Sequence, residues 1–228
     1  MRILLIMKDR LAVISSKNPS KNALSKTIEN IKFFYPEFDI VIIDSDSDDK
    51  TNYLQVPDDC IIEYCKNKNW ELGAWYYAFN KYNNYKVYMF IQDSLIPNSR
   101  ISTLDANVYD NGTIFTCNYN FNAFLAQGGY FENLQNVYRN TELDFISKLH
   151  PNTKITGAAH GFFITNNEEV SKILQLENTY IEKKLVKTKI DSWLFERTLG
   201  IIADTFIKRI NVWSFFTKIH CNRDYPAD

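Results

Sequence analysis

The chain has 228 residues and a formal net charge of −1, because 26 Lys and Arg residues face 27 Asp and Glu residues. This balance gives no overall positive field, so we expect neither nucleic acid nor an anionic membrane as a partner. With 45% hydrophobic residues, the chain can bury a substantial core, and we expect a single domain over residues 1–228.

Apolar runs in the sequence are short. Val87 to Ile91 and Ile201 to Phe206 fall well below the roughly 20 residues that a membrane-spanning helix needs. The apolar start at Met1 lacks the length and the cleavage site of a secretory signal. The cysteines show no spacing of a zinc site or disulfide framework: Cys60, Cys65, Cys117 and Cys221. We therefore expect reduced thiols, no membrane span and a cytoplasmic location.

The first segments of the chain predict a strand, a helix and a second strand. Arg2 to Met7 has the apolar character of a strand, and Asn18 to Ser20 precedes a helix. The apolar residues of that helix recur at helical spacing: Ala23, Leu24, Ile28, Ile31 and Phe34. The second strand is expected over Asp39 to Ile43. A right-handed connection makes the two strands parallel neighbours.

An acidic segment follows the second strand directly. Four of the six residues from Asp44 to Asp49 are Asp. In a parallel sheet this loop emerges at the edge where ligands usually bind, and a carboxylate there can accept hydrogen bonds from a base or ribose. The alternative is a solvated turn, because Asp is common in turns.

The next segments predict a third strand over Cys60 to Tyr64, a helix over Trp70 to Tyr82 and a buried fourth strand. Within the segment KVYMFIQDSLIP, the apolar run of this fourth strand ends abruptly at Asp93. Two strands therefore deliver acidic residues to one edge of the sheet, and one crevice can hold both. A metal or a nucleotide is the expected ligand of that crevice.

The second half of the sequence has a weaker pattern, apart from its last helix. It first predicts a short helix beginning within Ser99 to Asp105, a strand over Thr113 to Asn118 and an aromatic loop over Tyr119 to Tyr130. A helix over Glu132 to Leu149 and a strand over Ala159 to Thr165 are expected next. Two further helices are expected, one over Glu168 to Leu176 capped by Asn166 and one over Asp191 to Lys208.

Taken in order, these segments resemble the GT-A fold of nucleotide-sugar-dependent glycosyltransferases. The matching stretches are IVIIDSDSDD, KNKNWELGAWYYAFNKY, FIQDSLIP, GAAHGFFITNNEEV and IDSWLFERTLGIIA. The resemblance implies an α/β fold whose mixed, mainly parallel sheet is flanked by helices. It also implies transfer of a hexosyl or related group from a nucleotide-sugar donor to a glycan or other hydroxyl acceptor.

The same resemblance implies roles for individual residues of the donor site. The implied donor-binding residues are Asp44, Asp46, Asn69, Gly73 and Asp93. The fourth strand of such enzymes usually ends in a DxD motif that holds a divalent metal. Here the match is Gln92-Asp93-Ser94, which keeps only the central carboxylate. Mn²⁺ or Mg²⁺ is accordingly implied at Asp93, with water completing its coordination.

Acceptor-side roles follow from the later motifs. In such enzymes an acidic residue at or just before the last helix often takes the acceptor proton, which makes Asp191 and Glu196 the catalytic candidates. Five helical positions separate them by roughly 140°, so both cannot point straight into one site. Glu196 has an alternative role in an ion pair with Arg197. His160 is a candidate for acceptor or phosphate contact, with a structural role as the alternative.

Two rival functions remain open. A nucleotidyltransferase would be expected to carry a glycine-rich loop after its first strand, and Asp9 to Lys17 contains no glycine. A non-catalytic nucleotide- or carbohydrate-binding member of the fold is favoured by the departure from DxD at Gln92 to Ser94. Acidic residues on three separate segments oppose that second rival.

Overall fold

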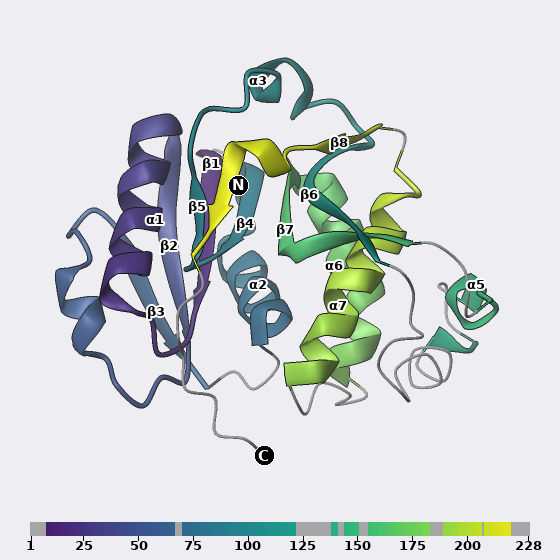
Figure 1. Ribbon diagram of the computed structural model, residues 1–228, viewed down its shortest axis with the longest axis horizontal. Helices are drawn as coiled ribbons and strands as arrows, with labels where there is room; N and C mark the ends of the chain where they lie inside the picture. Colours follow the sequence, from purple (N-terminus) through teal and green to yellow (C-terminus); the bar gives the residue numbers. More distant parts are fainter. Residues whose placement is uncertain are drawn as a thin grey trace, which may run out of the picture.

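A seven-stranded sheet runs through the part of the chain that the computed structural model describes, which comprises residues 8–66, 70–121, 138–140, 144–150, 155–182, 189–206 and 208–219. The strands within these residues are β1 (Lys8–Ser16), β2 (Phe38–Ser45), β3 (Ile61–Cys65), β4 (Tyr85–Gln92), β5 (Leu95–Pro97), β6 (Thr113–Phe121), β7 (Ile155–Asn166), β8 (Lys208–Asn211) and β9 (Phe216–Lys218). The sheet has the order β3-β2-β1-β4-β7-β6-β8, and β5 pairs separately with β9 (Figure 1).

Strand direction within the large sheet is mainly parallel. β7 runs antiparallel to both of its neighbours, β4 and β6, and every other neighbouring pair is parallel. The helices are α1 (Lys21–Phe34), α2 (Trp70–Lys81), α3 (Leu104–Asn107), α5 (Asp144–Ser147), α6 (Asn167–Glu182) and α7 (Lys189–Ala203), with short 3₁₀ helices η1 (Thr51–Gln55) and η3 (Trp213–Phe215). The mixed, mainly parallel α/β fold expected from the sequence is confirmed.

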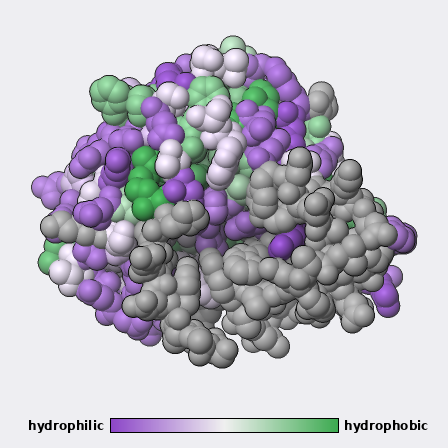
Figure 2. Space-filling model, in the orientation of Figure 1, coloured by the Kyte–Doolittle hydropathy of each residue, from purple (hydrophilic) through white to green (hydrophobic). Residues whose placement is uncertain are grey.

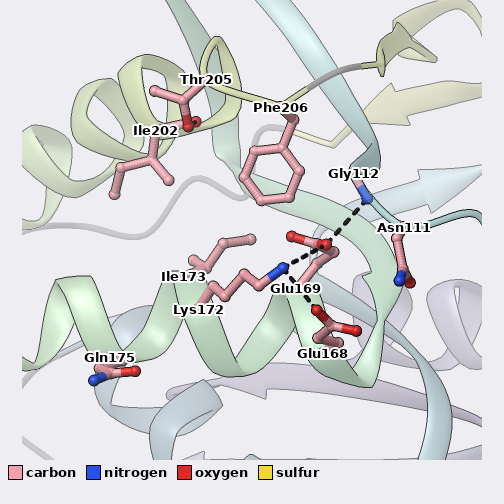
Figure 3. Close-up of a pocket in the computed structure, with 10 residues that line it drawn as sticks. All are labelled: Asn111, Gly112, Glu168, Glu169, Lys172, Ile173, Gln175, Ile202, Thr205 and Phe206. Atoms are coloured by element: carbon pink, nitrogen blue, oxygen red, sulfur yellow. Dashed lines mark hydrogen bonds and ion pairs between the residues drawn. The ribbon is translucent and has the colours of Figure 1, made fainter.

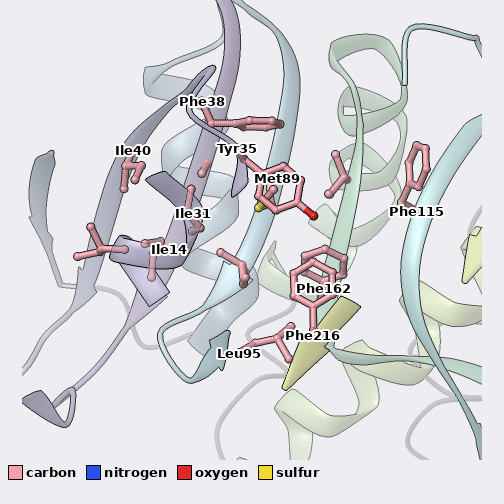
Figure 4. Packing of buried hydrophobic residues seen from close by; sticks show 14 of the residues in the cluster. Ile14, Ile31, Tyr35, Phe38, Ile40, Met89, Leu95, Phe115, Phe162 and Phe216 are labelled. Carbon is pink, nitrogen blue, oxygen red and sulfur yellow. The ribbon is translucent and has the colours of Figure 1, made fainter. Parts of the chain in front are cut away.

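Hydrophobic side chains cover both faces of this sheet. Residues of α2, α6 and α7 pack on one face. Residues of α1 and α3 pack on the other, together with the β5–β9 pair. Figure 4 shows part of this second cluster, where Phe162 of β7 lies beside Phe216 of β9 with ring centroids 4.5 Å apart. The β5–β9 pair is therefore held against the sheet by core packing.

The strand predicted over Arg2 to Met7 lies outside the described residues. The first described strand, β1, covers Lys8–Ser16, which includes most of the stretch where a phosphate loop was looked for. Leu11 to Ile14 are fully buried, with alternate residues facing the two clusters. Arg10 interrupts the apolar pattern, but it is buried because its guanidinium pairs with Glu37 at 2.9 Å and Asp105 at 2.7 Å.

The turn after β1 lies later in the chain than Asp9 to Lys17. The turn occupies residues 17–20, between the end of β1 and the start of α1, and its sequence is KNPS. It also contains no glycine. A glycine-rich phosphate loop is therefore absent from the turn that follows β1.

Most other elements appear where the sequence predicts them, with shifted ends. Asn166 caps α6, because its Oδ1 accepts a hydrogen bond from the backbone N–H of Glu169 at 3.0 Å. The last helix ends at Ala203, and Lys208 already belongs to β8. A continuous helix up to Leu149 is wrong, because Asn140 has a φ of 61° and a separate short helix, α5, follows.

The described surface carries scattered apolar side chains. Figure 2 shows hydrophobic residues in small groups among hydrophilic ones on one face. Large exposed side chains such as Phe33, Leu54 and Tyr109 come from separate parts of the chain, and single exposed apolar residues are normal on folded proteins. Among the described residues, no helix is long and apolar enough to cross a membrane.

Helix α7 approaches β7 so closely that one position requires glycine. A Cβ atom at Gly200 would lie 2.3 Å from Thr156 O and 2.6 Å from Gly157 Cα. Arg209 reinforces this contact, since it donates hydrogen bonds to the carbonyl oxygens of all three residues.

We expect Gly200→Ala to lower the free energy of unfolding by roughly 1–3 kcal/mol, because added atoms in a tight contact force a backbone shift. Helix propensity alone predicts the opposite sign, since Ala is favoured over Gly by about 1 kcal/mol within a helix. Urea unfolding measures the difference. A variant more stable than the parent would contradict the close approach of α7 and β7.

Candidate functional site

The order of the strands reverses between β1 and β4. Successive strands β2 and β3 lie on one side of β1, whereas β4 lies on its other side. The intervening helices α1 and α2 cover opposite faces of the sheet. In open α/β sheets such a reversal leaves a crevice at the carboxyl ends of the strands, where ligands bind. Ser16 ends β1 at this point, and Asp93 follows the end of β4.

Asp93 is fixed at the reversal by contacts on its side chain and its backbone. Its Oδ2 accepts a hydrogen bond from Ser16 Oγ at 2.9 Å. Its N–H donates to Ser15 O, and its carbonyl oxygen accepts from Thr27 Oγ1 of α1, both at 3.0 Å. The residue is only 3% exposed. A buried carboxylate thus stands where the sequence predicts it.

Asp44 is also buried, and its carboxylate forms hydrogen bonds within the turn that follows β2. It accepts from the backbone N–H of Ser47 at 3.2 Å, from Ser47 Oγ, and from Tyr53 Oη at 2.8 Å. Asp44 is 1% exposed, whereas Asp46 is exposed with a φ of 61°. The solvated turn is therefore the right description of Asp46 and the wrong one of Asp44.

Tyr53 connects the two carboxylates. Its hydroxyl lies 2.8 Å from Asp44 Oδ1 and 3.0 Å from Ser16 Oγ, so its single proton can be donated to either of them, one at a time, while Ser16 donates to Asp93. Burial raises the pKa of Tyr53 well above its ordinary value, so the phenol keeps its proton as a donor. The Asp44–Tyr53–Ser16–Asp93 chain joins the ends of β2, β1 and β4.

An ammonium group from the far end of the chain reaches the turn after β4. Lys218 Nζ donates to Gln92 Oε1 at 2.7 Å and to Ser94 Oγ at 2.6 Å. Sequence reasoning missed Lys218, because its short strand β9 offers little local pattern. Its position depends on the antiparallel pairing of β9 with β5, in which Lys218 lies opposite Leu95.

The first turn of α2 also contacts this end of β4. Gln92 Nε2 donates a hydrogen bond to Glu71 Oε1 at 2.8 Å. Gly73 lies in the same turn of α2 and is partly buried, whereas Asn69 lies outside the described residues. Gln92, the first residue of the segment that matches DxD, is thus a neutral amide that contacts the carboxylate of Glu71 and the ammonium group of Lys218.

His160 lies on β7 near the same edge of the sheet. β7 is antiparallel to β4, with Phe163 opposite Phe90, so the residues that precede Phe163 run beside the end of β4. His160 has a φ of 55° close to a register shift between β6 and β7. Its ring stacks on Trp213 with centroids 5.9 Å apart and planes 27° apart. This half-exposed pair forms an aromatic surface, and Trp213 was not predicted.

Both acidic candidates, Asp191 and Glu196, belong to α7. Glu196 is partly buried and precedes Gly200 by one helical turn, which puts it on the side of α7 that meets β7. Asp191 belongs to α7, but its side chain lies outside the described part. Neither prediction of a catalytic role is tested by these positions.

A cavity of about 580 Å³ lies at the other edge of the sheet (Figure 3). It is lined by the start of α6, the loop before β6 and the end of α7. Glu169 projects into it and accepts hydrogen bonds from Gly112 N and Lys172 Nζ, both at 3.0 Å. Asn166 next to it pairs with Val87 near the start of β4, so the cavity is remote from Asp93.

No family model and no curated protein matches the chain. Among solved structures, the galactosyltransferase LgtC with donor and acceptor sugar analogues is similar over 89% of this chain and 73% of its own, at 12% identity and a TM-score of 0.48. GalNAc-T7 with UDP, GalNAc and Mn²⁺ is similar over 48% of this chain and 23% of its own, at 15% identity and a TM-score of 0.42.

The mannosyltransferase PcManGT from Pyrobaculum calidifontis, with GDP-Man and Mn²⁺, is similar over 47% of this chain and 34% of its own, at 13% identity and a TM-score of 0.39. This chain thus spans well under half the length of GalNAc-T7 and PcManGT. All three are GT-A glycosyltransferases, the family that the sequence motifs resemble. The similarity is a distant one of chain path, so the activity has to be argued from the site itself.

We expect Tyr53→Phe to lower the free energy of unfolding by roughly 1–3 kcal/mol, because the buried pair of acceptors, Asp44 and Ser16, loses the hydroxyl that donates to one or the other. Urea unfolding measures this loss. Tyr64→Phe is the matched control, since Tyr64 is 52% exposed and surface substitutions usually change stability by less than about 0.5 kcal/mol. Equal stabilities of the two variants would contradict the hydrogen-bonded chain.

Proposed function

We propose that this protein is a glycosyltransferase, which binds a nucleotide-sugar donor at the carboxyl ends of β1, β2 and β4 and transfers the sugar to a glycan or other hydroxyl acceptor. One observation carries the proposal. Two buried carboxylates, Asp44 and Asp93, lie at the reversal of strand order, with Tyr53 and Ser16 between them. The proposal treats residues 1–228 as one domain.

The donor is proposed to lie along the edge from β2 to β4. Its nucleoside lies on the side of Asp44, Asp46 and the start of α2, and its diphosphate lies beside Asp93. Sugar transfer leaves negative charge on the diphosphate, so a cation placed there in advance stabilises the transition state. Asp93 accepts hydrogen bonds from donor hydroxyl groups, a role that suits a carboxylate already held in place by Ser16.

The divalent metal predicted at Asp93 fits the described residues poorly. Mg²⁺ and Mn²⁺ prefer several oxygen ligands, but Gln92 Oε1 and Ser94 Oγ both accept hydrogen bonds from an ammonium group. Within the described residues, no three His, Cys, Asp or Glu side chains gather as a metal site. We therefore derive no step of the reaction from a metal.

The acceptor is proposed to bind on the side of β7. The stacked rings of His160 and Trp213 offer an apolar surface against which the face of a sugar ring can pack. A carboxylate of α7, from Asp191 or Glu196, takes the proton of the attacking hydroxyl. The close contact of α7 with β7 at Gly200 holds the helix beside this strand.

Calorimetric titration with UDP-, GDP-, dTDP- and CMP-sugars tests donor binding, and free nucleotide released in the presence of hydroxyl acceptors tests transfer. We expect one nucleotide class to bind. In that class, Asp93→Asn should weaken binding by roughly tenfold or more, because a charged hydrogen-bond acceptor is lost. Asp59→Asn is the control, since Asp59 is exposed and pairs with Lys32.

Failure of all four classes to bind would overturn the proposal. Binding of a nucleotide sugar without release of nucleotide to any acceptor would instead favour the non-catalytic nucleotide-binding alternative. The departure of Gln92-Asp93-Ser94 from DxD is the sequence feature that favours this alternative.

Separate substitutions in α7 identify the proton acceptor. We expect either Asp191→Asn or Glu196→Gln to lower kcat by roughly 10²–10⁴-fold with little change in donor affinity, because general-base catalysis contributes about this much. The other variant should keep most of its activity. Steady-state kinetics with saturating donor measure both. Near-normal kcat in both variants would exclude α7 as the source of the base.

A further inference from the structure

We propose that the cavity beside Glu169 is a binding site for a neutral saccharide, separate from the edge where the donor is proposed to bind. The inference does not depend on the proposed transfer, because the cavity lies near the start of β4 and the donor edge lies at its end. At about 580 Å³, the cavity falls within the range of roughly 300–1,000 Å³ that small-molecule sites occupy.

One oxygen of Glu169 is open to this cavity. The residue is only 4% exposed, and its Oε1 accepts hydrogen bonds from Gly112 N and Lys172 Nζ. Among the described residues, no hydrogen-bond partner reaches Oε2. Figure 3 shows this second oxygen turned away from Gly112 and toward the space that Phe206 and Ile173 line. A ligand that donates a hydrogen bond there satisfies a charged acceptor that burial otherwise leaves without one.

Donor and acceptor groups lie side by side along the polar wall of the cavity. Lys172 Nζ lies 2.9 Å from Glu168 Oε1 and 3.0 Å from Glu169 Oε1. Its hydrogen bonds to Glu168 and Glu169 raise the pKa of Lys172, so the ammonium group keeps its charge. Asn111 adds an amide, which can both donate and accept. A hydroxyl group has the same double capacity, so neighbouring hydroxyl groups of one ligand suit this wall.

The remaining wall of the cavity is apolar. Ile173 of α6 and Ile202 of α7 are almost fully buried, and the ring of Phe206 lies just beyond the end of α7 (Figure 3). A sugar ring has an apolar face of C–H groups that can pack on an aromatic ring, while its hydroxyl groups reach polar side chains at the rim. The two walls thus match the two kinds of surface that a saccharide presents.

The charges of the polar wall favour a neutral ligand. A cation would lie close to the ammonium group of Lys172, and an anion would lie close to the carboxylates of Glu168 and Glu169. A wholly apolar ligand would leave Glu169 Oε2 buried without a donor, which is costly. A saccharide avoids all three penalties, because its hydroxyl groups carry no charge and donate hydrogen bonds.

NMR titration of the full chain labelled with ¹⁵N-glycine tests the inference, since its seven glycines are separate reporters. Gly112 N–H donates to Glu169 at the cavity. Gly73 lies in α2 at the proposed donor edge, and Gly161 follows His160 in β7. The probes are glucose, galactose, mannose, N-acetylglucosamine and their neutral disaccharides. We expect at least one of them to shift the Gly112 resonance and to leave that of Gly73 unchanged.

Two substitutions within the cavity test the chemistry of binding. Glu169→Gln should weaken saccharide binding by roughly tenfold or more, because the charged acceptor is lost. Phe206→Leu should weaken it severalfold, because the ring face is lost while the position stays apolar. Glu63→Gln is the matched control: it removes a carboxylate that pairs with Lys81, but on β3 at the far edge of the sheet. This control should bind saccharide as the parent does.

Several outcomes would overturn the inference. They are the absence of any shift with every saccharide, and shifts confined to Gly73 or Gly161. Binding as tight as that of the parent in folded Glu169→Gln would also overturn it, and Phe206→Leu provides the same comparison if that variant does not fold. A Gly112 shift with cyclohexylammonium and with no saccharide would assign the cavity to amines instead. None of these results bears on the proposed function, which nucleotide-sugar binding tests separately.

Discussion

The hydrogen-bonded chain from Asp44 through Tyr53 and Ser16 to Asp93 is the constraint on which the site depends. It holds two buried carboxylates on strands that are separated by β1. A buried polar group without a partner is costly, so each member fixes the position of the next. The acidic turn after β2 is ordered for the same reason, since Ser47 completes the hydrogen bonds of Asp44. The edge is therefore prepared before any ligand binds.

Positive charge reaches this acidic edge from the last described strand. The β5–β9 pair packs on the sheet through Phe216 and brings Lys218 to the turn at Gln92. Charges of both signs consequently meet where the strand order reverses. The cavity beside Glu169 has a comparable mixture of charges, but it lies at the edge where β4 begins. Topology, and not cavity size, is thus the reason for placing the proposed site at the strand ends.

Local patterns in the sequence account for much of the fold and for both buried carboxylates. Apolar runs and helical spacing are local properties, so they locate β2, α2 and β4 well. The strand over Lys8–Ser16 was missed, since Arg10 interrupts its apolar pattern and is buried only through its distant partners Glu37 and Asp105. Lys218 was missed for a similar reason. It contacts Ser94 across 124 positions of the chain, and such a tertiary contact leaves no local signal.

We propose that a nucleoside diphosphate binds at the reversal of strand order, with its phosphates beside the Asp93 turn. A crystal structure of the chain, grown with its preferred nucleoside diphosphate, tests this claim most directly. We predict phosphate oxygens beside Asp93 and the nucleoside beside Asp44. A nucleotide bound in the cavity beside Glu169 would contradict the account.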